Sequence, residues 1–282
     1  MTIKIVSDST CDISPELIEK YNIGILPLYV TMNNKTGRDN VDIFPKDIFE
    51  YVDNGGEICS TAAVNVNDYL EAFNELSVKN DAVINICIGS GFSSCYQNAC
   101  IAAEQFSNVY VVDSCNLSSG QGHIVVCAAL MAEAGMHPDE ICAKLKDLTS
   151  RVEASFLIDR LDYMCKGGRC SAVAALGANL LKIKPCIEVI GGKMRVVKKY
   201  RGPFERCIEA YVKDRLDGRS DIVNDRIFIT HPSATPKSVE TARNAIPKYK
   251  DFSEIIETRA GCTVSAHCGP NTLGVLFIRK GQ

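Results

Sequence analysis

Residues 83–102 combine an apolar run, a loop of small polar residues and an apolar stripe at helical spacing. The run is rich in β-branched residues and predicts a buried strand, and the stripe predicts a helix. Gly89, Gly91, Ser93 and Ser94 lie between them, so the backbone can turn sharply and place N–H groups and hydroxyls at a helix N-terminus, where an anion is favoured. Ser93 is our first candidate ligand, and a role as a simple helix cap is the alternative.

The N-terminal half alternates strand-like and helix-like segments. Strands are predicted at residues 3–6, 23–31, 83–88 and 109–112. Helices are predicted from Ser14-Pro15 onward and over residues 45–54, 67–76, 120–134 and 138–150. This alternation favours a parallel, Rossmann-like sheet covered by helices, in which ligands lie beyond the C-terminal ends of the strands. Ser93 and Ser114 fall at such ends.

The pattern changes after residue 150. Strands are predicted at 154–158, 226–230, 254–257 and 274–279, helices at 203–216 and 236–246, and a hairpin at 186–201 that turns at Gly191-Gly192. A glycine loop with basic residues, 163–171, and an apolar helical stripe ended by Pro185 precede the hairpin. We therefore predict a two-domain α/β protein, with a parallel sheet in residues 1–152 and a mixed sheet in residues 153–282.

Composition narrows the class of protein. The 282 residues are 46% hydrophobic and 23% charged, which suits a globular protein with a sizeable core. A net charge of −3 gives no indication of binding to nucleic acid or to an anionic membrane. No apolar run reaches the ~18 residues of a spanning helix, and the N-terminus passes directly into a strand pattern. We expect a cytoplasmic protein without stable membrane insertion.

The fourteen cysteines do not form a recognisable metal or redox motif. No C-x-x-C occurs, and the nearest pairs have spacings that fit neither a zinc ribbon nor a redox dithiol. Those pairs are Cys95/Cys100, Cys165/Cys170 and Cys262/Cys268. We expect reduced cysteines that act mostly as small buried hydrophobic residues, and no metal site.

Two further polar residues stand out. Thr61 lies in a small hydroxyl-bearing segment just before a predicted helix, so its local setting matches that of Ser93. His267 lies in a segment that precedes the last apolar strand, and the pattern predicts that it sits on a turn. A histidine there can hold an anion or a proton, and a purely structural role in the turn is the alternative.

A serine hydrolase acting on an acyl ester is the second interpretation of this chain. Residues 91–95 nearly match the G-x-S-x-G nucleophile elbow, with Ser93 as nucleophile and a histidine late in the chain. Cys95 replaces the second glycine, however, and no HGG-type oxyanion segment is visible. A dinucleotide site is weaker still, because Gly89-Ser90-Gly91 lacks the third glycine.

Several segments together resemble the DegV family, the fatty-acid-binding proteins that serve as the FakB subunit of bacterial fatty acid kinase. The resemblance spans nearly the whole chain. It rests on KIVSDSTCDIS (4–14), Ser60-Thr61, SGFSSCYQNA (90–99), Gly167-Gly168-Arg169, NLLKIKP (179–185) and HCGPNTLG (267–274). Two segments depart from the usual pattern, because Thr61 is followed by Ala62-Ala63 instead of Ser-Gln and Ser93 by Ser94-Cys95 instead of Gly-Thr.

The resemblance implies a protein without cofactor or catalysis of its own that holds one long-chain fatty acid between two domains. The implied carboxylate ligands are Thr61, Ser93, His267 and Arg169, with Ser60, Ser94 and Cys95 as neighbouring polar contacts. The protein would present the carboxylate to an ATP-dependent kinase subunit, which Arg201 would contact. The alternating basic residues 193–201 also fit a solvated strand edge. A regulatory protein that binds another small anion is a third interpretation.

A fatty acid would be held mainly by its tail. Burial of about ten methylenes at ~0.8 kcal/mol each gives on the order of 8 kcal/mol, whereas one charge-assisted hydrogen bond nets ~1.5–3 kcal/mol. Candidate tunnel residues are Phe92, Ile158, Leu176, Leu180 and Leu181. Each of them also fits an ordinary core position.

Overall fold

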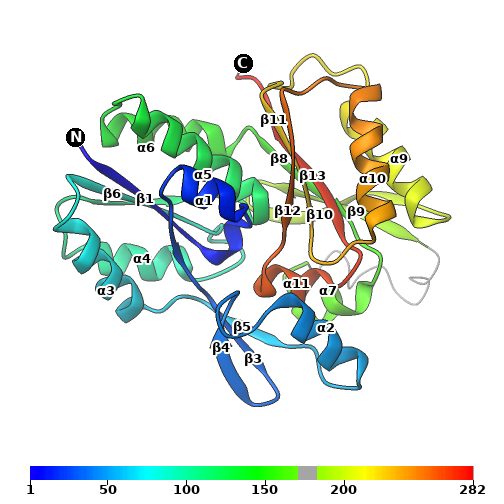
Figure 1. Ribbon diagram of the computed structural model, residues 1–282, viewed down its shortest axis with the longest axis horizontal. Coiled ribbons are helices and arrows are strands. Elements are labelled where there is room, and N and C mark those ends of the chain that lie inside the picture. Colours follow the sequence, from blue (N-terminus) through cyan, green and yellow to red (C-terminus); the bar gives the residue numbers. More distant parts are fainter. Residues whose placement is uncertain (171–182, 282) are drawn as a thin grey trace.

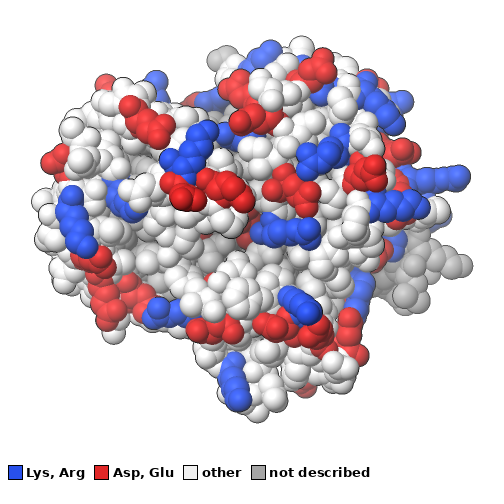
Figure 2. All heavy atoms as spheres, viewed as in Figure 1, with Lys and Arg blue, Asp and Glu red and all other residues white. Residues whose placement is uncertain are grey.

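The computed structural model describes residues 1–170 and 183–281. The helix predicted before Pro185, with the candidates Leu176, Leu180 and Leu181, lies outside the described residues. No helix within them is long and apolar enough to cross a membrane. All fourteen cysteines are described, and no disulfide bond joins any two of them. On the face shown in Figure 2, basic and acidic side chains are interspersed.

A parallel four-stranded sheet forms the N-terminal half, as predicted. Its strand order is β2 (Gly24–Leu26), β1 (Ile3–Asp8), β6 (Ala82–Cys87) and β7 (Val109–Asp113). One face packs on α1 (Pro15–Lys20), α5 (Ser118–Glu133) and α6 (Pro138–Thr149), and the other on α3 (Val66–Ser77) and α4 (Cys95–Ala103) (Figure 1). All six residues of β6 are buried, because both sheet faces are covered.

The single strand predicted at 23–31 is wrong. The chain leaves the parallel sheet after β2, since Pro27 has no N–H to donate, and the N–H of Leu28 donates to Ser9 Oγ instead. The next strand, β3 (Tyr29–Met32), pairs antiparallel with β4 (Lys35–Arg38) and with β5 (Ser60–Ala62). We call these three strands the small sheet. The helix α2 (Pro45–Asp53) lies between β4 and β5 in the sequence, as expected.

The C-terminal half contains the predicted mixed sheet. Its order is β10 (Lys193–Tyr200), β9 (Lys184–Ile190), β8 (Val152–Leu157), β13 (Leu273–Ile278), β11 (Arg226–His231) and β12 (Glu254–Arg259), with only β11 and β12 parallel. The hairpin between β9 and β10 is confirmed, and Gly191 and Gly192 adopt the positive φ angles of 57° and 71° that its turn requires. The domain boundary at 152/153 stays a prediction.

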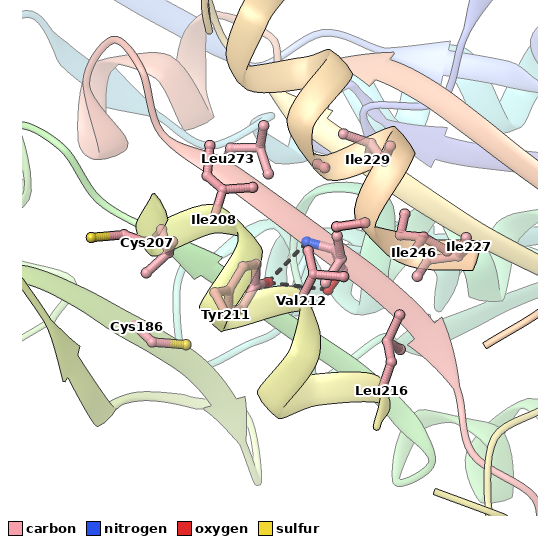
Figure 3. Packing of buried hydrophobic residues seen from close by; sticks show 14 of the residues in the cluster. Cys186, Cys207, Ile208, Tyr211, Val212, Leu216, Ile227, Ile229, Ile246 and Leu273 are labelled. Atoms are coloured by element: carbon pink, nitrogen blue, oxygen red, sulfur yellow. Dashed lines mark hydrogen bonds between the residues drawn. The ribbon is translucent and has the colours of Figure 1, made fainter. Parts of the chain in front are cut away.

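The helices α9 (Phe204–Leu216) and α10 (Pro236–Ala245) cover one face of the mixed sheet. Tyr211 lies within this core (Figure 3). Its hydroxyl donates to Ser155 O at 2.7 Å and accepts from Val275 N at 2.9 Å. The buried helix α5 packs against the opposite face and also against the parallel sheet. This helix therefore joins the two halves.

Two loops predicted in the C-terminal half contain helices. His267 does not sit on a turn but in α11 (Cys262–Cys268), whose first N–H groups find acceptors in distant parts of the chain. The predicted glycine loop at 163–171 begins with α7 (Leu161–Gly167), and Gly168 ends that helix with φ +68°. Both corrections concern residues near the candidate site.

Candidate functional site

A pocket of about 330 Å³ lies where the parallel sheet, the small sheet and α11 meet. Its volume is within the range of small-molecule sites. The apolar lining includes Leu28, Ile88, Phe92, Leu117, Met194 and Val264. The polar lining includes Thr61, Ser93, Ser94, Arg169 and His267. The tertiary structure therefore brings all four predicted carboxylate ligands to one cavity.

Thr61 and His267 are in direct contact. Thr61 Oγ1 lies 2.9 Å from His267 Nε2, although the two residues are 206 positions apart. Thr61 is held at the centre of β5, where it pairs with Val30 of β3. His267 lies in the last turn of α11. The small sheet and α11 thus meet at the polar end of the pocket.

The imidazole of His267 is neutral near pH 7. Burial, and secondarily the positive charge of Arg169, lowers its pKa to about 4. Its Nδ1 atom is buried and has no hydrogen-bond partner among the described residues. A Cβ at Gly167 would lie 2.4 Å from that atom, so only glycine allows α7 to approach the ring this closely. The ring of His267 can therefore act as a hydrogen-bonding group, but it carries no positive charge near pH 7.

Ser93 lines the pocket and lies one residue before Ser94, the N-cap of α4. Its Oγ atom accepts a hydrogen bond from Cys95 N at 3.3 Å and donates to Cys95 Sγ at 3.2 Å. Cys95 is fully buried behind it, and burial raises the pKa of that thiol to about 12. Ser93 is therefore a pocket residue whose hydroxyl also accepts from the first N–H of α4, while the N-cap position itself belongs to Ser94.

Arg169 follows α7 and brings a positive charge to the pocket. One of its guanidinium N–H groups donates to Gly167 O at 2.8 Å. Its side chain remains exposed, so the charge keeps most of its hydration. Ser94 lines the pocket as well, whereas Ser60, Cys95 and Arg201 lie outside the lining. Of the described tunnel candidates, Phe92 lines the pocket and Ile158 packs in a neighbouring core cluster.

The geometry gives no support to a catalytic pair of Ser93 and His267. In a serine hydrolase, the histidine bonds to the serine and its second nitrogen donates to a carboxylate. Here His267 bonds to Thr61, Ser93 bonds to Cys95, and Nδ1 has no carboxylate within hydrogen-bond distance in the described part of the chain. The site is suited to binding an anion.

Several pocket residues were missed by sequence reasoning. Val264 and Cys268 share one face of α11 with the predicted His267, at the spacing i, i+3, i+4 for residues 264, 267 and 268, and this signal becomes usable only once the segment is known to be helical. Leu117 lies in a loop that no periodic pattern predicts, because Cys115 and Ser118 on either side adopt positive φ angles of 49° and 54°.

A second, smaller cavity lies next to the first. Its volume is about 30 Å³, and it shares Leu117, Val264 and Cys268 with the larger pocket. Beyond them it is lined by residues of the mixed sheet such as Phe156 and Leu276. The larger cavity thus contains the contact between Thr61 and His267, and the smaller, more apolar cavity lies against the mixed sheet.

The hairpin of the mixed sheet forms one wall of the pocket. Met194 of β10 lines the cavity. At the hairpin tip, Gly192 O is so close to Gly91 that a Cβ at position 91 would lie 2.4 Å from that oxygen. The glycine at position 91 therefore permits the hairpin to close against the Ser93 loop.

Known proteins resemble this chain over almost its whole length. Residues 2–280 match the family described as "Uncharacterised protein, DegV family". A DegV domain-containing protein of Clostridium acetobutylicum is 33% identical over 288 residues, covering 99% of each chain. Another from Caldanaerobacter subterraneus is 30% identical over 282 residues, again covering 99% of each. The chain belongs to the DegV family.

Two solved structures are similar over the whole length. One, described as "Fatty Acid Binding of a DegV family Protein from Thermus thermophilus", is 25% identical with a TM-score of 0.90 and covers 99% of this chain and 100% of its own. DegV of Bacillus subtilis, described as a fatty acid binding protein, is 26% identical with a TM-score of 0.82, covering 99% and 100%. These similarities confirm the predicted fold class.

The depressed pKa of His267 makes stability depend on pH. The unfolded chain binds a proton at His267 below pH ~6.5, whereas the folded chain binds it only near pH 4. The free energy of unfolding should therefore fall as the pH drops from 6.5 toward 4, by up to about 1.4 kcal/mol per pH unit from this residue.

Urea unfolding of the wild-type protein and His267→Gln at pH 7, 6 and 5 measures this contribution. We expect the variant to lose less stability than the wild type on acidification. His137→Gln changes an exposed histidine and is the matched control. Identical pH slopes for the wild type and His267→Gln would contradict a depressed pKa.

Proposed function

We propose that this protein binds one long-chain fatty acid, with the carboxylate at the polar end of the pocket and the acyl tail toward the smaller, more apolar cavity. The observation that carries the proposal is the meeting of Thr61 and His267 in a cavity that lies next to a smaller, more apolar one. The relatives described as fatty acid binding proteins support it.

The polar end offers donors of the kind that a carboxylate needs. The hydroxyls of Thr61 and Ser93 and the N–H of a neutral His267 can each donate to a carboxylate oxygen. Arg169 contributes the positive charge, since its guanidinium is always protonated. The arrangement needs no metal ion to balance the anion.

The tail supplies most of the binding free energy. About ten buried methylenes contribute on the order of 8 kcal/mol before the costs of association, and each head-group hydrogen bond contributes ~1.5–3 kcal/mol. The head-group residues therefore orient the ligand and select for a carboxylate. Ala62 and Ala63 also line the pocket and make its polar end more apolar than Ser and Gln would.

The finer role that we propose is presentation of the bound carboxylate to an ATP-dependent fatty acid kinase subunit in the cytoplasm, which returns an acyl phosphate. The exposed basic residues of β10, together with the exposed Arg201 that follows it, support this role. Lys198 is already paired with Asp214, so it is a weaker candidate contact than Arg201.

Organic extraction of the purified protein followed by mass spectrometry tests fatty acid binding directly. We expect about one fatty acid per chain, and we expect Ser93→Ala and His267→Ala each to weaken retention by about 10- to 100-fold, which corresponds to the loss of one charge-assisted hydrogen bond. Ser253→Ala and His137→Ala alter exposed residues outside the pocket and serve as controls.

Other outcomes point to the alternatives. Turnover of an activated ester, with covalent labelling of Ser93 by a fluorophosphonate, would establish a hydrolase instead. Absence of any lipid from the extract, together with failure to bind added fatty acid, would favour a protein that binds another small anion.

Chain-length preference should depend on Val264, because this residue lines both cavities. In Val264→Phe, the added ring narrows the passage, so we expect a preference for acyl chains about two to four carbons shorter, each lost methylene being worth ~0.8 kcal/mol. Competition among saturated fatty acids of graded length measures this. Val197→Phe, at a residue that is 40% exposed, is the control. An unchanged preference would place the tail elsewhere.

The kinase role makes a separate prediction. Arg201→Ala should leave fatty acid retention unchanged and slow the formation of acyl phosphate when a fatty acid kinase subunit and ATP are supplied. The reason is that Arg201 lies outside the pocket and is exposed. Lys237→Ala, at another exposed cation, is the control. Equal rates for Arg201→Ala and the wild type would remove Arg201 from the kinase contact.

A further inference from the structure

Both ends of α11 contact the small sheet or the residue that directly follows its strand β4. At its C-terminal end, His267 meets Thr61 of β5. At its N-terminal end, the N–H groups of Cys262 and Thr263 donate to Asp39, the residue that follows β4. The small sheet therefore supplies Thr61, a proposed head-group ligand. The adjacent Asp39 anchors the helix that carries His267, another proposed ligand.

Asp39 uses both of its carboxylate oxygens on this contact. Oδ1 accepts from Cys262 N at 2.6 Å, and Oδ2 accepts from Thr263 N at 3.1 Å and from Ser9 Oγ at 3.0 Å. The side chain is 1% exposed. Ser9 Oγ in turn accepts from Leu28 N, in the segment between β2 and β3, so a second hydrogen bond fixes the hydroxyl that donates to Asp39.

Asp12, four residues after the end of β1, completes the anchor. Its Oδ1 accepts from Gly261 N at 2.8 Å, and its Oδ2 accepts from Ser118 Oγ at 2.5 Å. Three consecutive N–H groups at the start of α11 are thus bound by two buried carboxylates. These N–H groups have no acceptor within the helix, and leaving them buried and unpaired is costly.

A helix of seven residues cannot hold its position unaided. His267 is five residues after Cys262, about 7.5 Å along the axis at 1.5 Å per residue. Because α11 is short and regular, a shift or tilt of its first turn also moves the imidazole of His267 in its last turn. The position of the imidazole relative to Thr61 therefore depends on the carboxylates at the far end of α11.

We propose that Asp39 is a positioning residue for the head-group site: through Cys262 and Thr263 it sets the register of α11, so that His267 meets Thr61 and the two can bind a carboxylate together. This inference rests on the proposed function and names a residue that controls its selectivity. Loss of the anchor should weaken recognition of the carboxylate and spare burial of the tail.

The two anchoring carboxylates differ in what an amide can replace. Asparagine at position 12 can accept from Gly261 N through Oδ1 and donate to Ser118 Oγ through Nδ2, so both contacts survive. Burial raises the pKa of Asp12 well above its ordinary value. Asparagine at position 39 would direct an NH₂ group at the N–H of Thr263, because both oxygens there accept from donors.

The test compares binding of palmitate and of 1-hexadecanol by delipidated wild-type protein, Asp39→Asn, Asp12→Asn and Asp42→Asn. Both probes share one tail, and only palmitate carries a charge. We expect Asp39→Asn to weaken palmitate binding at least 10-fold and hexadecanol binding less than twofold. Asp12→Asn should change palmitate binding less than threefold. Asp42→Asn is the matched control, because Asp42 accepts from Arg38 N in the same turn and lies outside the anchor.

A second variant perturbs the anchor from the helix side without removing a carboxylate. A Cβ at Gly261 would lie 3.0 Å from Asp39 Oδ1 and 2.7 Å from Asn40 Nδ2. Gly261 has φ −69°, which alanine adopts readily, so Gly261→Ala should shift the helix start without backbone strain. We expect the same selective loss of palmitate binding, and this variant carries the test if Asp39→Asn does not fold.

The outcomes separate this inference from the proposed function. Wild-type protein that binds neither probe would refute fatty acid binding itself. Wild-type protein that binds palmitate, combined with Asp39→Asn and Gly261→Ala that bind it equally well or lose both probes in parallel, would overturn the positioning role. A further check is Thr61→Val: adding Asp39→Asn to it should weaken palmitate binding less than threefold more, since both changes act on one contact.

Discussion

The contact between the start of α11 and the buried carboxylates of Asp12 and Asp39 is the interaction on which the site depends. Backbone N–H groups at a helix start need acceptors, and here the acceptors are side chains of two residues that come shortly after strands β1 and β4. A segment near the C-terminus is thereby held against residues more than 200 positions earlier. That contact sets the position of α11 and thereby places His267 within hydrogen-bond distance of Thr61.

The pocket exists because three layers meet without filling the space between them. The parallel sheet contributes the Ser93 loop, the small sheet contributes Thr61, and the mixed sheet contributes Met194 through its hairpin. The helix α5 packs on two of these sheets and keeps them at a fixed separation. The cavity is therefore a property of the junction and of no single half of the chain.

The electrostatics of the polar end follow from burial. An imidazole enclosed beside an arginine stays neutral, because its charged form would lose hydration and face a like charge. The lasting positive charge belongs to Arg169, which remains exposed and keeps its water. A neutral donor inside and a cation at the edge can recognise a carboxylate while the empty site avoids an unpaired buried charge.

Much of this protein was determined by its sequence alone. Hydrophobic periodicity predicted the parallel sheet, the mixed sheet and the hairpin at Gly191-Gly192, because strand and helix patterns are local. The hydroxyl-bearing segments around Thr61 and Ser93 were also identified as candidate sites, with helix capping as the alternative for Ser93, although Thr61 lies in a strand and not in a loop. The family resemblance, carried by motifs in order, added Arg169 as a candidate ligand and fatty acid binding as the expected function.

Only the tertiary structure decided the rest. The segment around His267 looks like a turn because its glycine, proline and asparagine lie just after it, and its helix forms only because Asp12 and Asp39 cap it from far away. The strand predicted over residues 23–31 is divided at Pro27 for a similar reason. The N–H of Leu28 donates to the side-chain Oγ of Ser9 and not to a backbone carbonyl of a neighbouring strand. Acceptors brought in by folding are invisible to any local pattern, and they determine where these backbone groups go.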